Sequence, residues 1–376
     1  MTASSSPEHD AAGLAGGRVT VDLAALVANW RTVATEAAGA ETAAVLKANG
    51  YGSGLQQAGA ALAKAGCRTF FVARPGEGLL LRKVATDAAI YVLDGLPPDA
   101  ADQYIASDLR PVLGSLSEIG EWAEAKRRGA TTGSALHIDT GMNRLGLTLA
   151  EAREIADDRD LLAALAPSLV MSHLACADTP AHPLNTRQLA AFREARALFP
   201  GVPASLANSA GAYLGADYRF DMVRPGIALY GAQFLPDRPP LKPVVTLEAR
   251  ILQVRDTAPG DTVGYGAVET IRKPARIAVL AAGYADGYHR AASSSDSRPG
   301  ARVFIRGRSA PLVGRVSMDL IAVDVTAIPE VDRGDWAELF GPNVPVDEVA
   351  AHAGTIGYEL LTGLGSRYER RYVAGP

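Results

Sequence analysis

The sequence is poor in cysteine and lysine, and it has no long hydrophobic run. Its 376 residues include only two cysteines, Cys67 and Cys176, which are too few for a disulfide framework. No Cys or His cluster has the spacing of a zinc site, so no metal is expected. No apolar stretch approaches the ~18 residues that a membrane-spanning helix needs. We therefore expect a reduced, cytoplasmic protein that does not enter a membrane.

Two further absences narrow the class of partner. The formal net charge is −4, so the chain lacks the basic excess of a protein that binds nucleic acid without sequence preference or an anionic membrane. Residues 1–17 are polar, small and Gly-rich, and they lack the basic start and apolar stretch of a signal peptide. We expect these residues to form a disordered tail.

Short apolar runs alternate with helix-like stretches from about residue 40 to residue 231. This alternation predicts eight βα units, and hence an α/β fold of the (β/α)8 TIM-barrel class over residues 18–240. A doubly wound sheet is the alternative, but it usually has fewer strands and a glycine fingerprint after the first. The predicted strands are residues 42–47, 69–73, 89–94, 110–114, 134–139, 168–174, 203–208 and 222–225.

A Pro-rich stretch, PDRPPLKP at residues 236–243, ends this alternation. Beyond it, β-branched runs are separated by turn signals such as PGD, RGR and RGD. The pattern predicts a mostly-β C-terminal domain over residues 241–376.

Reactive side chains recur at the carboxyl ends of the predicted barrel strands. They are Lys47, Asp139, His173, Asn208 and Arg224, on strands one, five, six, seven and eight. In a barrel enzyme the catalytic groups come from these ends, because the loops that follow them line one shared mouth. The spacing therefore predicts a single active site built from several strands.

Lys47 is the candidate for covalent chemistry among the six lysines. It follows the apolar run AAVL and precedes Gly50, Gly52 and Gly54. Partial burial would lower its pKa and free an amine for Schiff-base chemistry. An isolated strand-end lysine more often extends to water, and this Gly-rich turn is neither a Walker loop nor a GxGxxG fingerprint.

The loops after predicted strands seven and eight read NSAG at residues 208–211 and PGI at residues 225–227. They combine small residues, open backbone N–H groups and a hydroxyl, at the usual phosphate site of the barrel fold. Ordinary turn chemistry also produces either loop alone. A phosphate anchor together with a reactive amine suggests pyridoxal phosphate.

With these residues assembled, the chain from about Arg18 to Tyr372 resembles the alanine racemase family. AVLKANGYGSG, around Lys47, resembles the lysine signature of the family, and HIDTGMNRLG resembles its DTGM-x-R segment. The other similar segments, in order, are MSHLACAD, LANSAG, VRPGIALYG, VGYGA, GYADGY, GRVSMDL and GYELL. Their joint order and spacing are more specific than any one segment.

The resemblance implies a role for each matching residue. Lys47 would bond covalently to the cofactor, and Lys47 and Tyr265 would be the two acid/base groups on opposite faces. Arg144 and the Met318 backbone N–H would bind the substrate carboxylate, with Tyr284 at the substrate entrance and Asp319 beside Met318. The implied cofactor-binding residues are Lys47, Tyr51, His173, Asn208, Ser209, Arg224, Gly226, Ile227 and Tyr358.

One position departs from the family pattern. Members often carry a carbamylated lysine at the start of the DTGM segment, whose negative charge holds the arginine, whereas this chain has His137. A histidine cannot form a stable carbamate of that kind. We hypothesise that His137 holds Arg144 as a neutral acceptor, or as the partner of a bound anion such as chloride.

The resemblance implies an isomerase that interconverts L-alanine and D-alanine with pyridoxal 5'-phosphate and supplies D-alanine for the peptidoglycan of the cell wall. Moving a proton between the two faces of the α-carbon needs two opposed groups. The resemblance also implies a homodimer in which Tyr265 and Met318 serve the other subunit's barrel.

Other readings remain open. They are a non-catalytic pyridoxal-phosphate carrier and a racemase of broader amino-acid specificity. A decarboxylase of similar architecture would use a cysteine in the β domain, whereas both cysteines here lie in the predicted barrel.

Overall fold

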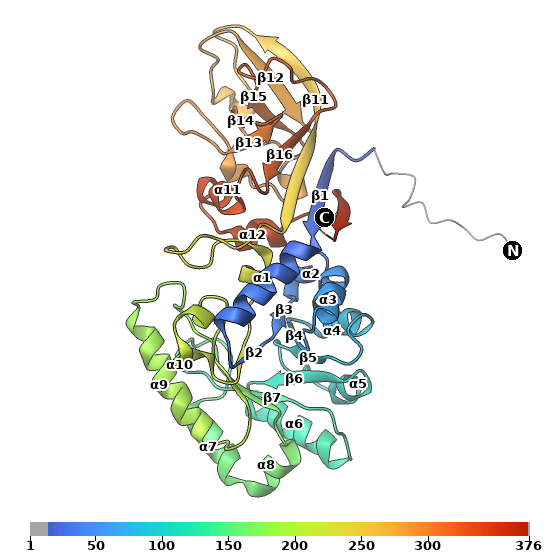
Figure 1. The fold of residues 1–376 in the computed structure, drawn as a ribbon, viewed down its shortest axis with the longest axis vertical. Helices are drawn as coiled ribbons and strands as arrows, with labels where there is room; N and C mark the ends of the chain where they lie inside the picture. Colours follow the sequence, from blue (N-terminus) through green and yellow to red (C-terminus); the bar gives the residue numbers. More distant parts are fainter. Residues whose placement is uncertain (1–13, 375–376) are drawn as a thin grey trace, which may run out of the picture. The chain divides into compact units, whose positions relative to one another are not determined.

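The computed structural model of the chain describes residues 14–374. They form two compact units (Figure 1): Ala24–Lys242 is one, and the segment up to Leu23 together with the segment from Pro243 is the other. Most of the predicted N-terminal tail, residues 1–13, lies outside the described residues.

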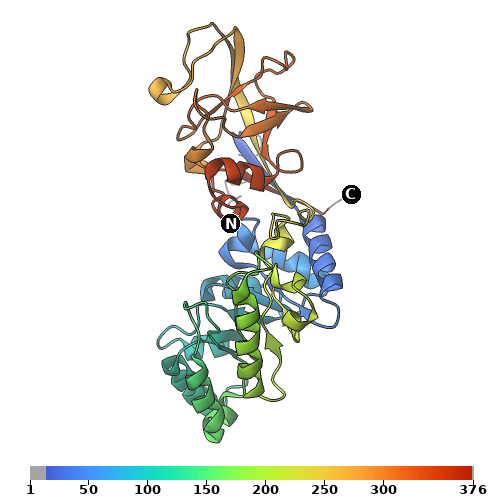
Figure 2. The same ribbon diagram turned by 90° about the vertical axis from the view of Figure 1, so that its left-hand side faces the viewer.

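The unit Ala24–Lys242 is built on short parallel strands (Figures 1 and 2). Strands β3 to β9 pair in sequence order, and β10 pairs with β2. The bounds are β2 Glu41–Thr42, β3 Ala44–Val45, β4 Thr69–Val72, β5 Ala89–Val92, β6 Leu109–Leu113, β7 Ala135–His137, β8 Leu169–Met171, β9 Ala204–Ser205 and β10 Met222–Val223. Every residue of β4 is buried, as expected for a parallel strand covered on both faces.

Backbone hydrogen bonds close these strands into a ring. Arg224 N donates to Ala207 O at 2.9 Å, which ties β10 to the chain that continues β9. Ala43 N donates to Val223 O, and Val45 N to Pro225 O, each at 3.0 Å. Since β2 and β3 are thus two parts of one strand, the ring has eight strands. The predicted barrel class is confirmed, although most strands are shorter than predicted.

Helices follow the strands of the barrel, and several of them begin with a capping side chain that satisfies a free backbone N–H group. Ser115 Oγ accepts from Glu118 N, and Thr148 forms a reciprocal capping box with Glu151. The bounds are α1 Leu23–Glu36, α2 Lys47–Tyr51, α3 Leu55–Lys64, α4 Pro75–Arg82, α5 Ala101–Ala106, α6 Leu116–Arg127, α7 Leu149–Asp157, α8 Arg159–Leu165, α9 Pro183–Ala197 and α10 Ala216–Arg219. Within residues 14–374, no helix is both long and apolar enough to cross a membrane.

The second unit is mostly β-structure, which confirms the predicted C-terminal fold class. Its long strand β11 (Val245–Thr257) pairs antiparallel with β1, β12 and β16. The other bounds are β12 Ala275–Leu280, β13 Arg302–Ile305, β14 Arg308–Pro311, β15 Ile321–Asp324, β16 Trp336–Phe340, β17 Glu369–Val373, α11 Val346–Ala353 and α12 Gly357–Thr362.

The predicted domain boundary places residues from 18 onward, and so nearly all of strand β1 (Gly17–Asp22), with the barrel. The structure places β1 in the sheet of the second unit, between β11 and β17. Val19 and Val21 are fully buried, and alternate residues of a strand share one face. The alternating pattern of this segment identifies a strand, but it carries no information about which strands lie beside it.

Candidate active site

The turn that carries Lys47 has an unusual backbone. Lys47 begins α2 one residue after β3, and Ala48, Asn49 and Gly50 have φ values of 53°, 55° and 61°. A left-handed conformation costs on the order of 1–2 kcal/mol for a residue with a side chain. The turn is held by Asn49 Oδ1, which accepts from Leu55 N at 2.9 Å, and by Ser53 Oγ, which donates to Gly50 O at 2.5 Å. Strain maintained in this way is typical of functional sites.

Glu77, on α4, fixes the same turn from the neighbouring loop. One carboxylate oxygen accepts from Asn49 N at 3.2 Å, and the other accepts from Ala73 N at 2.9 Å. The loops after β3 and β4 are therefore joined through one side chain, which limits the movement of the Lys47 backbone.

The amine of Lys47 is half-buried at the strand end. Burial, followed by the positive charge of Arg144, lowers its pKa from the ordinary value. A lower pKa increases the fraction of neutral amine near pH 7, and only the neutral amine acts as a nucleophile or a base.

Arg224 is a buried cation with neutral partners. Its guanidinium donates to Ser205 Oγ at 2.5 Å and to Ser172 O at 2.6 Å, and it lies 3.3 Å from His173 Nδ1. Burial lowers the pKa of Arg224 to about 9, so the side chain stays charged at pH 7. Among residues 14–374 no carboxylate forms an ion pair with it, and a ligand group that accepts a hydrogen bond would therefore be stabilised here.

Two neutral histidines lie near this cation. Burial lowers the pKa of His173 well below its ordinary value, and the charge of Arg224 acts in the same direction. Burial, then the charge of Arg224, lowers the pKa of His137 to about 4. Both side chains are therefore uncharged at pH 7, as the hypothesis of a neutral acceptor at position 137 requires.

The loop after β7 presents Arg144. Asp139 Oδ1 accepts from Gly141 N and Met142 N, each at 2.9 Å, and from Asn143 N at 3.2 Å. These bonds fold the loop tightly, and the Arg144 side chain is exposed beyond it. Within the described part of the chain Arg144 has no ion pair, but its charge acts on Lys47, His137 and His173.

A polar cradle lies at the ends of β9 and β10. Ser209 Oγ accepts from Gly226 N at 2.9 Å and from Ala228 N at 3.3 Å. A Cβ on Gly226 would lie 2.3 Å from the Tyr51 hydroxyl, so a glycine here permits the close approach of the tyrosine. Tyr51 stacks on Tyr230 with ring centroids 4.5 Å apart. Two backbone N–H groups and two hydroxyls thus converge, which is the donor set that a phosphate needs.

Asn208 and Ile227 flank this cradle. Asn208 Oδ1 accepts from Gly211 N at 2.9 Å and shapes the loop that carries Ser209. Ile227 is buried at the start of a short 3-10 helix, Ile227–Tyr230. The structure therefore brings together every predicted site residue that belongs to the barrel.

The remaining predicted residues lie in the second unit and have exposed side chains. Tyr265 is 72% exposed, Met318 53%, Tyr284 42% and Tyr358 36%. The Tyr284 turn (Tyr284–Asp286) and the Met318 loop (residues 315–320) are adjacent. Tyr284 N donates to Ser317 O, and Ala285 N donates to Met318 O, each at 3.0 Å. Such exposed apolar side chains, gathered in one unit, are typical of a surface that another chain covers.

Several supporting residues lie outside the sequence prediction. Ser205 Oγ accepts a hydrogen bond from Arg224, and Tyr230 stacks on Tyr51. Gln188 Nε2 donates to His173 O at 2.9 Å. Glu77 follows the second predicted strand, so its place at a strand end could have indicated it. Ser205 lies inside a predicted strand, where nothing in the sequence separates a supporting serine from a core residue.

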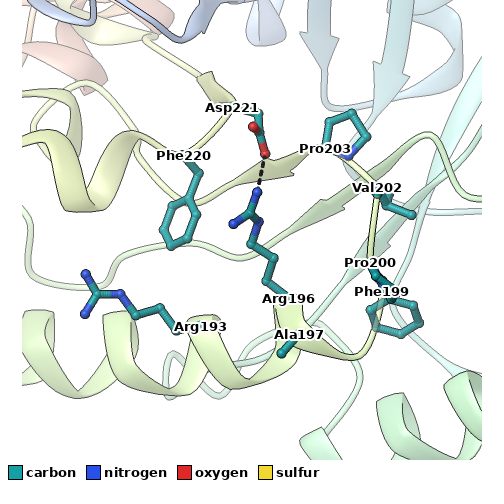
Figure 3. A pocket seen from close by; sticks show the side chains of 10 residues that line it. Arg193, Arg196, Ala197, Phe199, Pro200, Val202, Pro203, Phe220 and Asp221 are labelled. Carbon is teal, nitrogen blue, oxygen red and sulfur yellow. Dashed lines mark hydrogen bonds and ion pairs between the residues drawn. The ribbon is translucent and has the colours of Figure 1, made fainter.

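A hollow of about 700 Å³ in the barrel unit contains none of the predicted site residues (Figure 3). Its lining includes Arg196, which forms a 3.3 Å ion pair with Asp221, and Phe220. Pro203 and Asp221 directly precede β9 and β10, so this hollow lies at the amino ends of the strands. That end of a barrel serves stability rather than catalysis.

Comparisons with known proteins agree with this geometry. The family models described as alanine racemase, N-terminal domain, and alanine racemase, C-terminal domain, match residues 21–234 and 244–372. The chain is 52% identical to an alanine racemase of Methylobacterium nodulans over 96% of this chain and 97% of the relative. It is 48% identical to a biosynthetic alanine racemase of Agrobacterium fabrum, over 97% and 96% of the two chains.

Solved structures of alanine racemases are also similar to this chain in fold. A crystal structure of alanine racemase from Bartonella henselae with covalently bound pyridoxal phosphate has a TM-score of 0.89 and 40% identity. The match covers 96% of this chain and 100% of that one. A structure of alanine racemase from Streptomyces coelicolor has a TM-score of 0.90 and 33% identity, and covers 97% and 100% of the two chains.

Proposed function

The chain belongs to the alanine racemase family, and on this premise we propose that it interconverts L-alanine and D-alanine with pyridoxal 5'-phosphate as its cofactor. The observation that carries the proposal is the convergence, at the carboxyl ends of the barrel strands, of a reactive lysine, a phosphate cradle and a buried cation. Relatives over the full length of the chain share the name. The enzyme is thus an isomerase that acts on a small amino acid.

The residues of the barrel fit the cofactor. Ser209 Oγ and the N–H groups of Gly226 and Ile227 would hold its phosphate together with the Tyr51 hydroxyl, which can approach Gly226 because the glycine has no Cβ. Arg224 would donate to the pyridine nitrogen, His173 would lie at the ring, and Asn208 would shape the phosphate loop. Tyr358, in the second unit, would add a phosphate contact.

The cofactor, held in the barrel, would supply an electron sink for the substrate once the substrate amine has replaced Lys47 on it, which acidifies the proton on the α-carbon and leaves Lys47 a free amine. The side chains of the protein then carry the proton. The neutral Nζ of Lys47 would accept or donate it on one face, and the Tyr265 hydroxyl would do so on the other. Two opposed groups are needed because a single base would mostly return the proton to the face from which it came.

The substrate carboxylate would be held by Arg144 and by the backbone N–H of Met318. Arg144 has an exposed guanidinium free to form a two-pronged contact with a carboxylate. His137 would support Arg144 without a negative charge of its own. Tyr284 would border the substrate entrance, and Asp319 would support the Met318 loop.

The functional unit would be a homodimer with shared active sites. Its support is the exposure of Tyr265 and Met318, two large side chains of the second unit that a partner subunit would cover. A two-fold dimer would contain two equivalent sites. We further propose that the D-alanine serves peptidoglycan synthesis, and a cytoplasmic location stays a prediction.

The test combines the visible absorption band of the lysine-bound cofactor with formation of D-alanine from L-alanine. Wild-type protein should show both. Lys47→Ala should lose both, whereas Tyr265→Phe should keep the band and lose at least about a hundredfold in kcat/KM, since removing an acid/base group typically costs 10²–10⁴-fold. The matched control is Lys64→Ala, an exposed lysine on α3.

An absorption band that survives in Lys47→Ala would refute the assignment of the lysine. A band without D-alanine formation in the wild type would instead favour a non-catalytic carrier. Rates with serine and other amino acids, measured beside alanine, decide between a narrow and a broad racemase.

A further inference from the structure

Arg367 connects two segments of the second unit that are distant in sequence. It lies just before β17, and its guanidinium donates to Asp286 Oδ1 at 2.6 Å and to Asp319 Oδ1 at 2.7 Å. These partners are 81 and 48 residues away along the chain. Asp286 ends the turn of Tyr284, and Asp319 directly follows Met318.

Asp286 is a buried carboxylate that depends on this arginine. Its side chain is 7% exposed, and its other oxygen accepts from Gly283 N at 2.9 Å. A buried carboxylate without a cation is costly, because it has lost its hydration. Arg367 is the cation that forms an ion pair with Asp286 within residues 14–374.

The two segments that Arg367 joins are also in close backbone contact. A Cβ on Gly283 would lie only 2.3 Å from Met318 O, so the glycine permits the approach. Two backbone hydrogen bonds, from Tyr284 N and Ala285 N to Ser317 O and Met318 O, complete the junction. The position of the Met318 backbone is therefore set by the Tyr284 turn, and Arg367 holds the two together from the side.

The pair of Arg371 and Glu369, on the strand β17 that follows Arg367, is an ordinary surface ion pair. Its members are two residues apart, and their distance is 2.8 Å. The Arg371 side chain is 45% exposed and that of Arg367 is 51% exposed. The two arginines are thus alike in charge and exposure. They differ because Arg367 bridges segments that are remote in sequence, and it reaches one of them through a buried carboxylate.

We propose that Arg367 is a positioning residue that fixes the Met318 loop against the Tyr284 turn and so sets the site for the substrate carboxylate. The inference rests on the proposed function, in which the Met318 N–H binds that carboxylate. It follows that loss of Arg367 weakens substrate binding more than it slows the chemical step, since the two acid/base groups lie elsewhere.

The experiment compares Arg367→Met with Arg371→Met in the holoenzyme. Arg367→Met should raise the KM for L-alanine about tenfold and change kcat less than about threefold, because uniform binding is lost while the reacting groups remain. Arg367→Lys, which keeps the charge but not the forked contacts, should give an intermediate KM. Arg371→Met should leave both constants within about twofold of the wild type.

Amide hydrogen exchange supplies a readout that is independent of activity. Peptides that cover residues 283–287 and 315–320 should exchange faster in Arg367→Met, and not in Arg371→Met. Equal exchange in the two variants, or a KM for Arg367→Met no different from that of Arg371→Met, would overturn the proposal.

Asp319→Asn decides the question if Arg367→Met does not fold, because it keeps the buried pair and removes only the bridge to the Met318 loop. An increase of about threefold in KM supports the proposal, and an unchanged KM overturns it. A wild-type protein without racemase activity would refute the proposed function instead, so the two failures are distinguishable.

Discussion

Burial, reinforced by the positive charges at the mouth of the barrel, explains the protonation states of the two histidines there. Burial lowers the pKa values of His137 and His173, and the positive charges of Arg144 and Arg224 lower both further. The charge of Lys47 adds to the effect on His173. A histidine in such surroundings is stable only in its neutral form. Position 137 therefore holds a neutral group, and it does not introduce an additional cation.

The depressed pKa of His137 makes stability depend on pH. The unfolded side chain takes up its proton near pH 6.5 and the folded one only near pH 4. Between these values the unfolded state binds more protons, so stability is present above pH 6.5 and falls as the pH drops toward 4. His137→Asn should remove about 3 kcal/mol of this decline in the free energy of unfolding.

Denaturant unfolding at pH 7, 5.5 and 4 measures the effect. The control is His182→Asn, an exposed histidine that caps α9 through its ring nitrogen, because asparagine also caps helices. A pH profile of His137→Asn that superimposes on the wild-type profile would contradict the burial of a neutral histidine.

At the scale of elements, the site depends on turns rather than on strands or helices. The left-handed turn after β3 and the loops after β9 and β10 bring the Lys47 backbone, the Tyr51 hydroxyl and the Gly226 N–H to one end of the barrel. Ring closure between β10 and the first strand makes the first and last loops neighbours. The cradle is therefore a consequence of closure and would not exist in an open sheet.

Gly226→Ala tests the cradle. Its Cβ would lie 2.3 Å from the Tyr51 hydroxyl, and Tyr51 is held by its stack on Tyr230. Displacement of the tyrosine should weaken cofactor binding by about tenfold or more, measured by titration of the apoprotein with pyridoxal phosphate. Gly120→Ala, on the exposed face of α6, is the control, because the added Cβ would meet no atom of another part of the chain within 4 Å. It should keep the affinity and raise stability by about 1 kcal/mol. Equal affinities in the two variants would exclude the cradle as the phosphate site.

At the scale of the whole molecule, the proposed chemistry is divided between two units of the fold. Lys47 lies in the barrel, whereas Tyr265 lies in the β unit, which also recruits the N-terminal strand β1. If the two groups come from different subunits, then two inactive variants contain all the parts of an active site between them.

A mixture of Lys47→Ala and Tyr265→Phe protomers tests the shared site. A heterodimer would have one site with both substitutions and one with neither. With random reassociation, half of the dimers are mixed, so the mixture should regain about a quarter of the wild-type activity. The control is each variant reassociated with itself, which should stay inactive. No recovery in a mixture whose subunits demonstrably exchange would place both groups in the same subunit.

Much of the site could be predicted from the sequence because its residues stand at strand ends. Lys47, His173, Asn208 and Arg224 follow apolar runs, and a barrel gathers such positions at one mouth whatever the loop lengths. The supporting residues could not be predicted in this way. Ser205 and Arg367 act through contacts with residues that are remote in the chain, and local pattern carries no record of such contacts.

The sequence by itself determined the barrel, the β unit and the residue types of the site, since periodicity and strand-end chemistry are local properties. Tertiary structure alone decided that β1 belongs to the second unit, that Arg224 is buried among neutral partners and that Arg367 joins two remote segments. The physical reason is that burial, and the pKa shifts and ion pairs that follow from it, depend on which surfaces meet in three dimensions.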